Sequence, residues 1–251
     1  SRASRKDIRN AVVAARSGYE LWNSKTAYER GQILYRLAEM LEGRKEQFAA
    51  EIFHSTTITK PQASKEVMKS VDRIIWYAGF ADKWSQLVGT VNPVQSGYFN
   101  FSIPEATGVV GILLPNDLPL LSLVSRICPV IVSGNSCIII ASETSPLPAL
   151  SFSEVIATSD FPAGVINILT GLKKELVPHL AGHMDVNAFD YADSNPAFKK
   201  DVQSACANNV KRFVYSAHKD AKDYFDDDTN ENLNQIQNFV EIKTIWHTMG
   251  I

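Results

Sequence analysis

Apolar side chains recur at helical spacing through the first part of the chain. Residues three and four apart lie on one face of a helix, so such a stripe predicts an amphipathic helix. Two stripes comprise Ile8, Val12, Ala15, Tyr19 and Trp22, and then Ile33, Leu34, Leu37, Met40 and Leu41. We expect two further helices over residues 44–53 and 63–87. The pattern therefore predicts a helical region over residues 1–90 whose stripes pack into a core.

The period of the pattern changes to two after Gly89. Phe99, Phe101 and Ile103 alternate with polar residues, which is typical of a half-buried strand. We expect this strand in an antiparallel hairpin over residues 91–104.

Short apolar runs alternate with helical segments from Thr107 onward. The predicted strands are 109–113, 137–140, 165–169, 186–189 and 213–215, and the predicted helices are 118–132, 147–158, 174–181 and 197–208. Alternation of this kind indicates an α/β fold with a doubly wound, five-stranded parallel sheet. We assign residues 105–216 to this Rossmann-like domain.

The tail of the chain is polar and acidic before it becomes apolar again. Three aspartates in a row, Asp226 to Asp228, lie in the stretch 217–232, which we interpret as a solvated linker. A cation site is the weaker interpretation, because no ligand spacing follows. Residues 233–251 then predict a short helix over 233–239 and a closing strand over 240–247.

Composition excludes several classes of protein. The chain has 251 residues, 45% of them hydrophobic, and a net charge of −2, which does not suit nucleic-acid binding through a basic surface. No apolar run approaches the ~20 residues that span a bilayer. No apolar stretch follows the first residues, so we expect no signal peptide, and the absence of an initiator Met suggests a piece of a longer protein.

Cysteine and histidine usage indicates neither a disulfide framework nor a metal site. The three cysteines, Cys128, Cys137 and Cys206, form no CxxC pair, which favours the cytoplasm or another reducing compartment. His179 and His183 are four residues apart but have no acidic partner between them, so we expect no metal.

Ordered motifs along almost the whole chain resemble the aldehyde dehydrogenase superfamily. They include Trp22, Arg30, the Tyr-Ala-Gly-Phe-Ala-Asp-Lys stretch at 77–83, the Pro-Glu-Ala-Thr-Gly-Val-Val-Gly stretch at 104–111 and the Phe-Pro-Ala-Gly-Val-Ile-Asn stretch at 161–167. The closing segment 239–246 resembles the family's last strand of this region. The resemblance implies the family's cofactor-binding domain, which in active members serves an NAD(P)-dependent aldehyde oxidoreductase.

Two positions that carry chemistry in the family differ here. Where the family has an Asn that stabilises the oxyanion, this chain has Asp117, and an ionised carboxylate accepts hydrogen bonds but donates none. Where the family has a Lys near the adenosine ribose, this chain has Ile140, which leaves Glu143 alone at that site. The resemblance therefore implies a vestigial cofactor site.

A third departure lies where the family has a Phe-Thr-Gly-Ser turn beside the pyrophosphate. This chain has Phe189 followed by Asp190, Tyr191 and Ala192, which adds bulk and charge where glycine permits close approach. Beyond residue 215 no Glu-Leu-Gly-Gly segment follows, and no cysteine has the surroundings of the family's nucleophile. We expect no cofactor, no catalytic residue and no catalytic domain in this chain.

The elements that remain resemble the family's oligomerisation strands. We expect association through Tyr98, Phe99, Phe101, Ile103, Ile242, Thr244 and Trp246. The leading hypothesis is a pseudoenzyme module that binds an aldehyde dehydrogenase catalytic unit or another copy, similar to the truncated C-terminal part of aldehyde dehydrogenase family 16 members. Two alternatives stay open: the cofactor-binding portion of an active enzyme that uses NAD or NADP, and a module whose old cleft, lined by Asp117, Asp190 and Asp193, takes a cation or a basic peptide.

Overall fold

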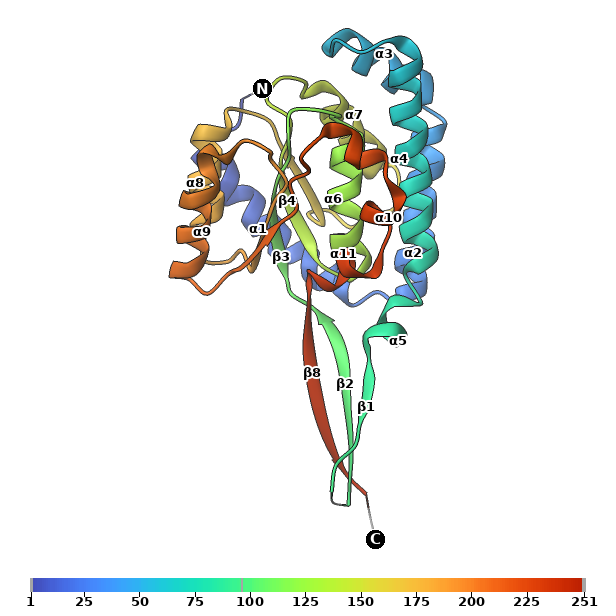
Figure 1. Ribbon diagram of the computed structural model, residues 1–251, viewed down its shortest axis with the longest axis vertical. Coiled ribbons are helices and arrows are strands. Elements are labelled where there is room, and N and C mark those ends of the chain that lie inside the picture. Colours follow the sequence, from blue (N-terminus) through green and yellow to red (C-terminus); the bar gives the residue numbers. More distant parts are fainter. Residues whose placement is uncertain (1, 96, 250–251) are drawn as a thin grey trace.

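Two sheets organise residues 2–95 and 97–249, the part of the chain that the structure, a computed structural model, describes (Figure 1). The larger sheet is parallel, with the strand order β5-β4-β3-β6-β7. Its strands are β3 (Val109–Leu113), β4 (Ser136–Ile140), β5 (Ile166–Leu169), β6 (Ala188–Tyr191) and β7 (Arg212–Tyr215). The predicted doubly wound, five-stranded parallel sheet is confirmed.

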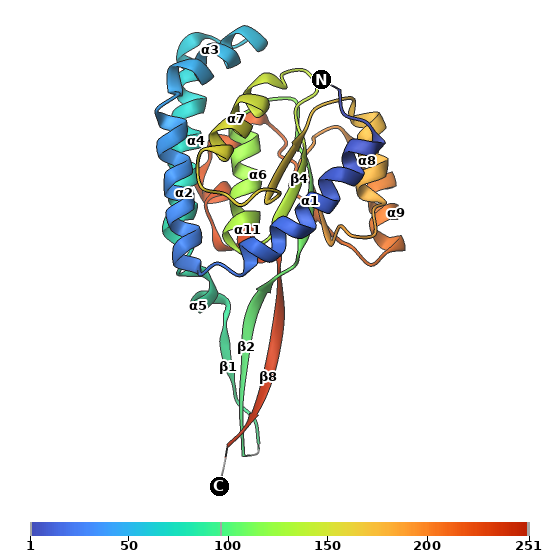
Figure 2. The same ribbon diagram turned by 180° about the vertical axis from the view of Figure 1, so that it is seen from behind.

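Helices cover both faces of the parallel sheet (Figures 1 and 2). One face carries α1 (Arg5–Asn23), α8 (Lys173–Ala181) and α9 (Lys199–Asn208), and the other carries α6 (Leu121–Val132) and α7 (Leu147–Ala157), with α2 (Ala27–Glu42), α3 (Lys45–Ser55) and α4 (Lys60–Phe80) outside them. Successive residues of a strand face opposite sides. Val109 and Leu113 therefore pack beneath α1 and α8, whereas Val110 and Ile112 pack with α4 and α6.

Local chemistry explains where the predicted helix boundaries differ from the observed ones. Helix α4 begins earlier than expected, at Lys60, because Thr59 and Gln62 form a capping box and Pro61 suits the first turn. It ends at Phe80, just after Gly79, and the predicted continuation to residue 87 is a separate short helix, α5 (Trp84–Val88). The strand predicted over 186–189 lies two residues later as β6.

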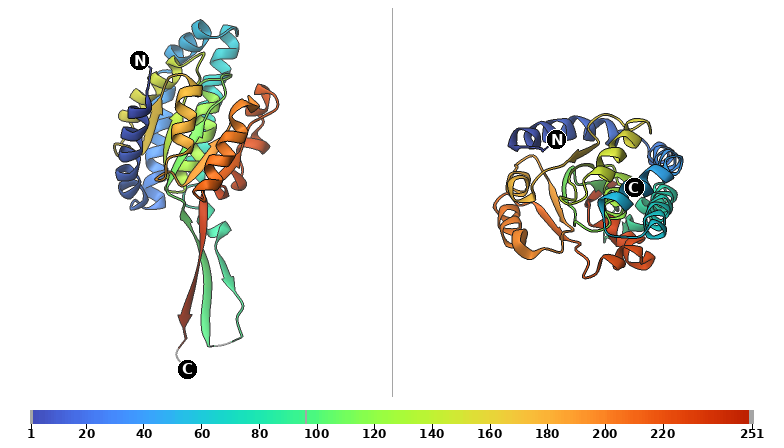
Figure 3. Two further views of the ribbon diagram at one scale, coloured as in Figure 1. Left: turned by 90° about the vertical axis from the view of Figure 1, so that its left-hand side faces the viewer. Right: turned by 90° about the horizontal axis from the view of Figure 1, so that it is seen from above.

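A narrow antiparallel sheet projects from the body (Figures 1 and 3). It contains β1 (Thr90–Asn92), β2 (Tyr98–Ala106) and β8 (Val240–Thr248) in the order β1-β2-β8, with Phe101 opposite Ile245. The strand is half-buried as predicted, but its buried face carries the polar residues and its exposed face carries the apolar ones. Asn100 and Ser102 are 2% and 9% exposed, whereas Phe99 and Ile103 are 41% and 37% exposed.

Polar side chains along this sheet satisfy one another across the strands. Asn92 Nδ2 donates to Asn100 Oδ1 at 2.6 Å and to Ser102 Oγ at 2.9 Å, and the Ser102 and Thr244 hydroxyls lie 2.9 Å apart. The apolar residues Phe99 and Ile103 lie on the opposite face of the sheet and stay partly exposed. The strand pattern predicted the alternation but not which face would be covered.

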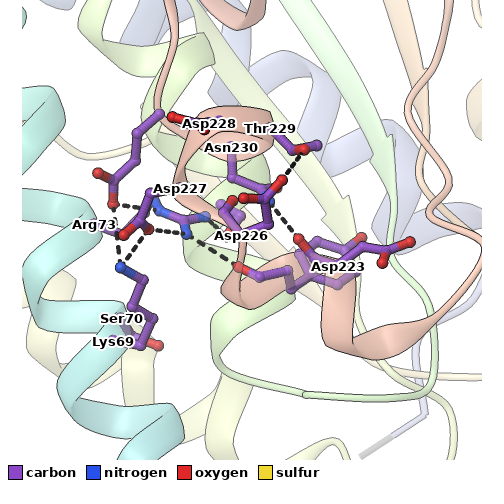
Figure 4. A network of polar contacts seen from close by, with 12 residues as sticks. Lys69, Ser70, Arg73, Asp223, Asp226, Asp227, Asp228, Thr229 and Asn230 are labelled. Atoms are coloured by element: carbon purple, nitrogen blue, oxygen red, sulfur yellow. Dashed lines mark hydrogen bonds and ion pairs between the residues drawn. The ribbon is translucent and has the colours of Figure 1, made fainter.

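The stretch 217–232 is folded, so its prediction as a linker is wrong, although its three aspartates, Asp226 to Asp228, are exposed to solvent. It forms a 3₁₀ turn, η2 (Ala221–Phe225), and a short helix, α10 (Asp227–Asn230), and α11 (Leu233–Gln237) follows. Tyr224 and Asn230 are 2% and 1% exposed. The physical reason is the buried guanidinium of Arg73 on α4, which binds the backbone oxygen of Tyr224 and the carboxylate of Glu231 (Figure 4).

Arg73 joins this acidic stretch to the helical core. Its Nη2 donates to the backbone oxygen of Tyr224 at 3.0 Å, its Nε to Glu231 at 2.9 Å and its Nη1 to Ser125 Oγ at 2.7 Å. Asp227 accepts from Arg73 at 3.4 Å and also pairs with Lys69 (Figure 4). The segment therefore packs against α4 and α6 as part of the body.

Candidate functional site

The carboxyl ends of β3 and β6 define the place where a doubly wound sheet binds ligands. From β3 the chain winds outward to β4 and β5, and it then returns to place β6 on the other side of β3. Ligands bind in the crevice outside the strand ends at such a reversal, because the loops diverge there. Asp117, Ile140, Glu143, Asp190, Tyr191 and Ala192, the predicted vestigial positions, all lie in or just after strands of this sheet.

A buried lysine that the sequence did not single out lies between the ends of β3 and β6. Lys173 Nζ donates to the backbone oxygen of Leu114, just after β3, at 2.7 Å and to Asp193 Oδ2, just after β6, at 2.8 Å. The Lys173 residue is 3% exposed. Burial lowers the pKa of Lys173, and the neighbouring Asp193 opposes that shift. The two strand ends are therefore tied together by an ion pair at the reversal point.

Asp190 lies inside the body and not on a loop beside an anion site. It extends from β6 toward α6, where its Oδ2 accepts from Arg126 Nε at 2.7 Å, and its Oδ1 accepts from the Ser216 hydroxyl. Both ionic side chains are 1% exposed or less. Burial alone would lower the pKa of Arg126, but the Asp190 carboxylate raises it above its usual value. The hypothesis that Asp190 lines an open cleft is therefore wrong, because the residue is 0% exposed.

Tyr191 faces the opposite side of β6. Its ring lies 6.1 Å from that of Tyr215 and 6.2 Å from that of Phe213, and its hydroxyl donates to the backbone oxygen of Asn195. Residues 189–191 belong to the strand, so the turn predicted there lies further along the chain. Ile140 and Ala192 are fully buried as well.

Glu143 and Asp117 lie exposed on the loops after β4 and β3. Glu143 Oε2 accepts from the backbone N–H of Lys173 at 3.1 Å, and the backbone N–H of Glu143 donates to Asn116 Oδ1 at 3.0 Å. The charges of Asp193, Glu143 and Asp117 all act on Lys173. The fold thus gathers three of the predicted acids around one lysine. The sequence signal for this lysine was the pair Lys173 and Lys174 in the first turn of α8, where acidic residues are favoured.

All three cysteines are buried and free. Burial raises the pKa of Cys128 to about 12, and it also raises the pKa of Cys137 and Cys206. A thiol acts as a nucleophile only as the thiolate, so these side chains are poor nucleophiles. Among residues 2–95 and 97–249, no group of three or more His, Cys, Asp and Glu could hold a metal ion.

The predicted association residues divide between the two faces of the projecting sheet. Phe99, Phe101 and Ile103 share one face, and Tyr98, Ile242, Thr244 and Trp246 share the other. Trp246 and Ile242 are 61% and 55% exposed, and Tyr98 meets the Trp246 ring edge-on at 5.9 Å. Both faces therefore present apolar surface to solvent.

Comparison with known proteins identifies what the chain is similar to. The family model described as "Aldehyde dehydrogenase family" matches residues 1–218. Cytosolic aldehyde dehydrogenase 1 of Elephantulus edwardii is 31% identical over 216 residues, which cover 84% of this chain and 42% of the relative. The human mitochondrial 10-formyltetrahydrofolate dehydrogenase is also 31% identical, over 84% of this chain and 23% of its own.

Solved structures agree with these sequence matches. A putative aldehyde dehydrogenase from Burkholderia cenocepacia superposes with a TM-score of 0.80 at 30% identity, over 85% of this chain and 43% of that one. Betaine aldehyde dehydrogenase from Staphylococcus aureus, solved in complex with NAD+, gives a TM-score of 0.80 at 25% identity. The chain spans less than half the length of these relatives. No helix in the described part of the chain is long and apolar enough to cross a membrane.

Proposed function

This chain belongs to the aldehyde dehydrogenase family, and we propose that it is a catalytically inactive structural module of that family. In this proposal the module forms part of a longer aldehyde dehydrogenase chain, like the truncated part of family 16 members. It associates through its projecting sheet with an aldehyde dehydrogenase catalytic unit or with a second copy of itself. Its three buried free thiols suit a reducing compartment such as the cytoplasm.

The observation that carries the inactive half of the proposal is the ion pair across the crevice. A dinucleotide needs open space and N–H donors at the strand ends, so that its pyrophosphate can approach the backbone. Here Lys173 and Asp193 form an ion pair at the ends of β3 and β6, and the exposed acids Glu143 and Asp117 also act on Lys173. Ile140 offers no hydrogen bond to a ribose. These residues do not fit NAD or NADP in the manner of the family.

The cysteines and Asp117 support the same conclusion for the reaction itself. Aldehyde oxidation in this family needs a thiolate to attack the carbonyl carbon and donors to stabilise the oxyanion. None of the cysteines reaches the surface, and the carboxylate of Asp117 repels negative charge. Loss of one oxyanion donor alone costs about 10²–10³ in rate.

The projecting sheet supports the association half of the proposal. Both of its faces expose aromatic or branched side chains, and β8 is an edge strand whose outer side has no partner in the described part of the chain. An exposed edge strand with apolar faces is a template for pairing with another chain. The proposed partner is therefore an aldehyde dehydrogenase catalytic unit or a second copy of this sheet.

Sedimentation of the purified chain tests the association. We expect a concentration-dependent dimer or larger assembly, or binding to an added aldehyde dehydrogenase catalytic unit. Trp246→Ser should weaken it, whereas Val13→Ser should not, because Val13 is 64% exposed on α1, which packs on the parallel sheet. A monomer that ignores the catalytic unit at high concentration would contradict this part of the proposal.

Calorimetric titration with NAD and NADP tests the inactive half. The alternative, that this is the cofactor-binding portion of an active enzyme, predicts micromolar binding. We expect no binding in that range by the wild-type chain. Conversion of an aldehyde by the purified chain would also overturn the proposal.

A further inference from the structure

A basic pocket of about 270 Å³ lies between α1 and α8, two helices that Figure 2 shows side by side. Two arginines and two histidines line it and no acidic residue does; the lining residues are Arg5, Ile8, Arg9, Pro178, His179, Gly182 and His183. The histidines lie at the end of α8, whereas Lys173 of the crevice lies in its first turn. The pocket is therefore separate from the vestigial cofactor site, and the proposed association does not use it.

The packing of two helices brings the four basic side chains to one pocket. Arg5 and Arg9 are four residues apart on α1, and His179 and His183 are four residues apart at the end of α8. Residues at this spacing lie on one face of a helix. Ile8, which is 1% exposed, belongs to the same buried cluster as the apolar residues of α8. Each helix therefore contributes one basic pair to the walls.

The two guanidinium groups of the pocket are not neutralised by the protein. Within residues 2–95 and 97–249, the side chains of Arg5 and Arg9 form no hydrogen bond or ion pair. The acids close to them have other partners: Asp7 accepts hydrogen bonds in the capping box of α1, and Glu175 pairs with Arg2. An anion in the pocket would meet two positive charges for which no carboxylate competes.

His183 adds a hydrogen-bond donor. The backbone N–H of Asp185 donates to His183 Nδ1 at 3.3 Å, so Nδ1 is the acceptor of the ring. The ring proton is then on Nε2, which can donate to a ligand even when the imidazole is neutral. His179 supplies a second imidazole on the same wall.

The end of α8 does not repel an anion as a bare helix end would. A helix carries partial negative charge at its carboxyl end, on carbonyl groups that have no partner. Here Lys211 Nζ donates to the backbone oxygens of Ala181 and His183 at 2.6 and 3.0 Å, and the backbone N–H of Gly182 donates to that of Pro178 at 3.1 Å. Burial lowers the pKa of Lys211 to about 8, so the ammonium form still prevails at pH 7. Its positive charge offsets that of the carbonyl groups.

The arrangement of the donors favours a tetrahedral anion. Guanidinium groups bind phosphate through paired N–H groups, and here they come from one helix while the imidazoles come from the other. A phosphate has oxygens directed toward both walls and carries up to two negative charges, whereas a carboxylate has two oxygens in one plane and one charge. A metal ion does not suit the pocket, because both arginines would repel it.

We propose that the pocket between α1 and α8 binds a phosphate group, either inorganic phosphate or the head of a small phosphate monoester. Arg5 and Arg9 bind its oxygens from one side, and His183 Nε2 donates from the other. The proposal does not depend on the loss of catalysis or on association through the projecting sheet.

Calorimetric titration of the full chain with inorganic phosphate tests the proposal. We expect saturable one-to-one binding, weakened about tenfold in Arg5→Gln and in Arg9→Gln, because each variant loses a charged hydrogen-bond donor. Arg36→Gln is the matched control: it removes the same charge from an exposed side chain of α2, which lies on the other face of the sheet. It should bind like the wild type. All three side chains are exposed, so the variants should fold.

Two further probes identify the ligand. Acetate should bind at least tenfold more weakly than phosphate, and ethyl phosphate should bind as tightly as phosphate or more tightly. Tighter binding of the ester would assign the site to a monoester, and equal binding would assign it to the phosphate group alone. Unchanged affinity in Arg5→Gln and Arg9→Gln, an equal loss in Arg36→Gln, equal binding of acetate, or no saturation at millimolar phosphate would overturn the proposal.

Discussion

Replacement of Asp190 by Ala should destabilise the fold strongly, although its position resembles part of a cofactor site. Among the residues that the structure describes, the change removes the one carboxylate that pairs with Arg126, whose side chain is 1% exposed. One guanidinium nitrogen of Arg126, Nη2, already lacks a partner, and only Nη1 keeps Gln235 at 2.9 Å. The variant would therefore bury an uncompensated positive charge beneath α6.

The magnitude follows from the burial of the pair. Removal of one member of a buried ion pair costs about 3–5 kcal/mol, because the remaining charge stays desolvated. A typical domain has only ~5–15 kcal/mol of total stability. At about 2–4 °C per kcal/mol for a chain of this size, the melting temperature should fall by roughly 6–20 °C. A solvated loop acid at the same position would give a change below about 0.5 kcal/mol.

Urea unfolding followed by circular dichroism measures the effect. The matched control is Asp185→Ala, an exposed acid on the loop that precedes β6, which should leave the midpoint almost unchanged. The double variant Arg126→Met, Asp190→Ala should be more stable than Asp190→Ala alone, because no unpaired charge remains. A loss below about 1 kcal/mol for Asp190→Ala would refute the assignment of Asp190 to a buried structural pair.

Three further outcomes follow from the structure. A thiol reagent should label none of Cys128, Cys137 and Cys206 in the native chain and all three after unfolding, and rapid native labelling would contradict their burial. Burial raises the pKa of Glu66 from its ordinary value of 4.5 to about 7, so the folded state keeps the proton where the unfolded chain has lost it. The free energy of unfolding should therefore fall by roughly 3 kcal/mol as pH rises from 4.5 to 7. Between pH 5 and pH 8, urea unfolding should show a smaller loss of stability for Glu66→Gln than for the wild type. Equal losses in the two proteins would contradict the raised pKa of Glu66. Arg73→Met should speed amide hydrogen exchange across residues 220–232 while the parallel sheet stays protected, and unchanged exchange there would show that Arg73 does not hold the segment.

Local chemistry predicted most of the parallel sheet and its helices. Each strand of that sheet is a short apolar run, and burial on both faces requires no particular alternation, so sequence runs such as 109–113 identify it directly. The family resemblance was likewise carried by short ordered motifs. What these patterns do not contain is the partner of each polar group, which lies far away in the chain.

Lys173 and Asp193 show this difference at the candidate site. They are 20 residues apart in sequence, and the sequence pointed to Asp193 as a lining of the old cleft but not to Lys173 as its partner. Only the return of the chain from β5 to β6, on the other side of β3, brings Lys173 against the ends of both central strands. The presence of acids near the strand ends was predictable, but their pairing was not.

The sequence by itself determined the fold class and the family, because these depend on local period and on residue identity. Tertiary structure alone decided that Asp190 is buried against Arg126, that residues 217–232 fold onto Arg73, and that Phe99 and Ile103 face solvent. The reason is physical: hydrophobic burial and charge desolvation depend on what covers a residue, and the covering elements come from distant parts of the chain.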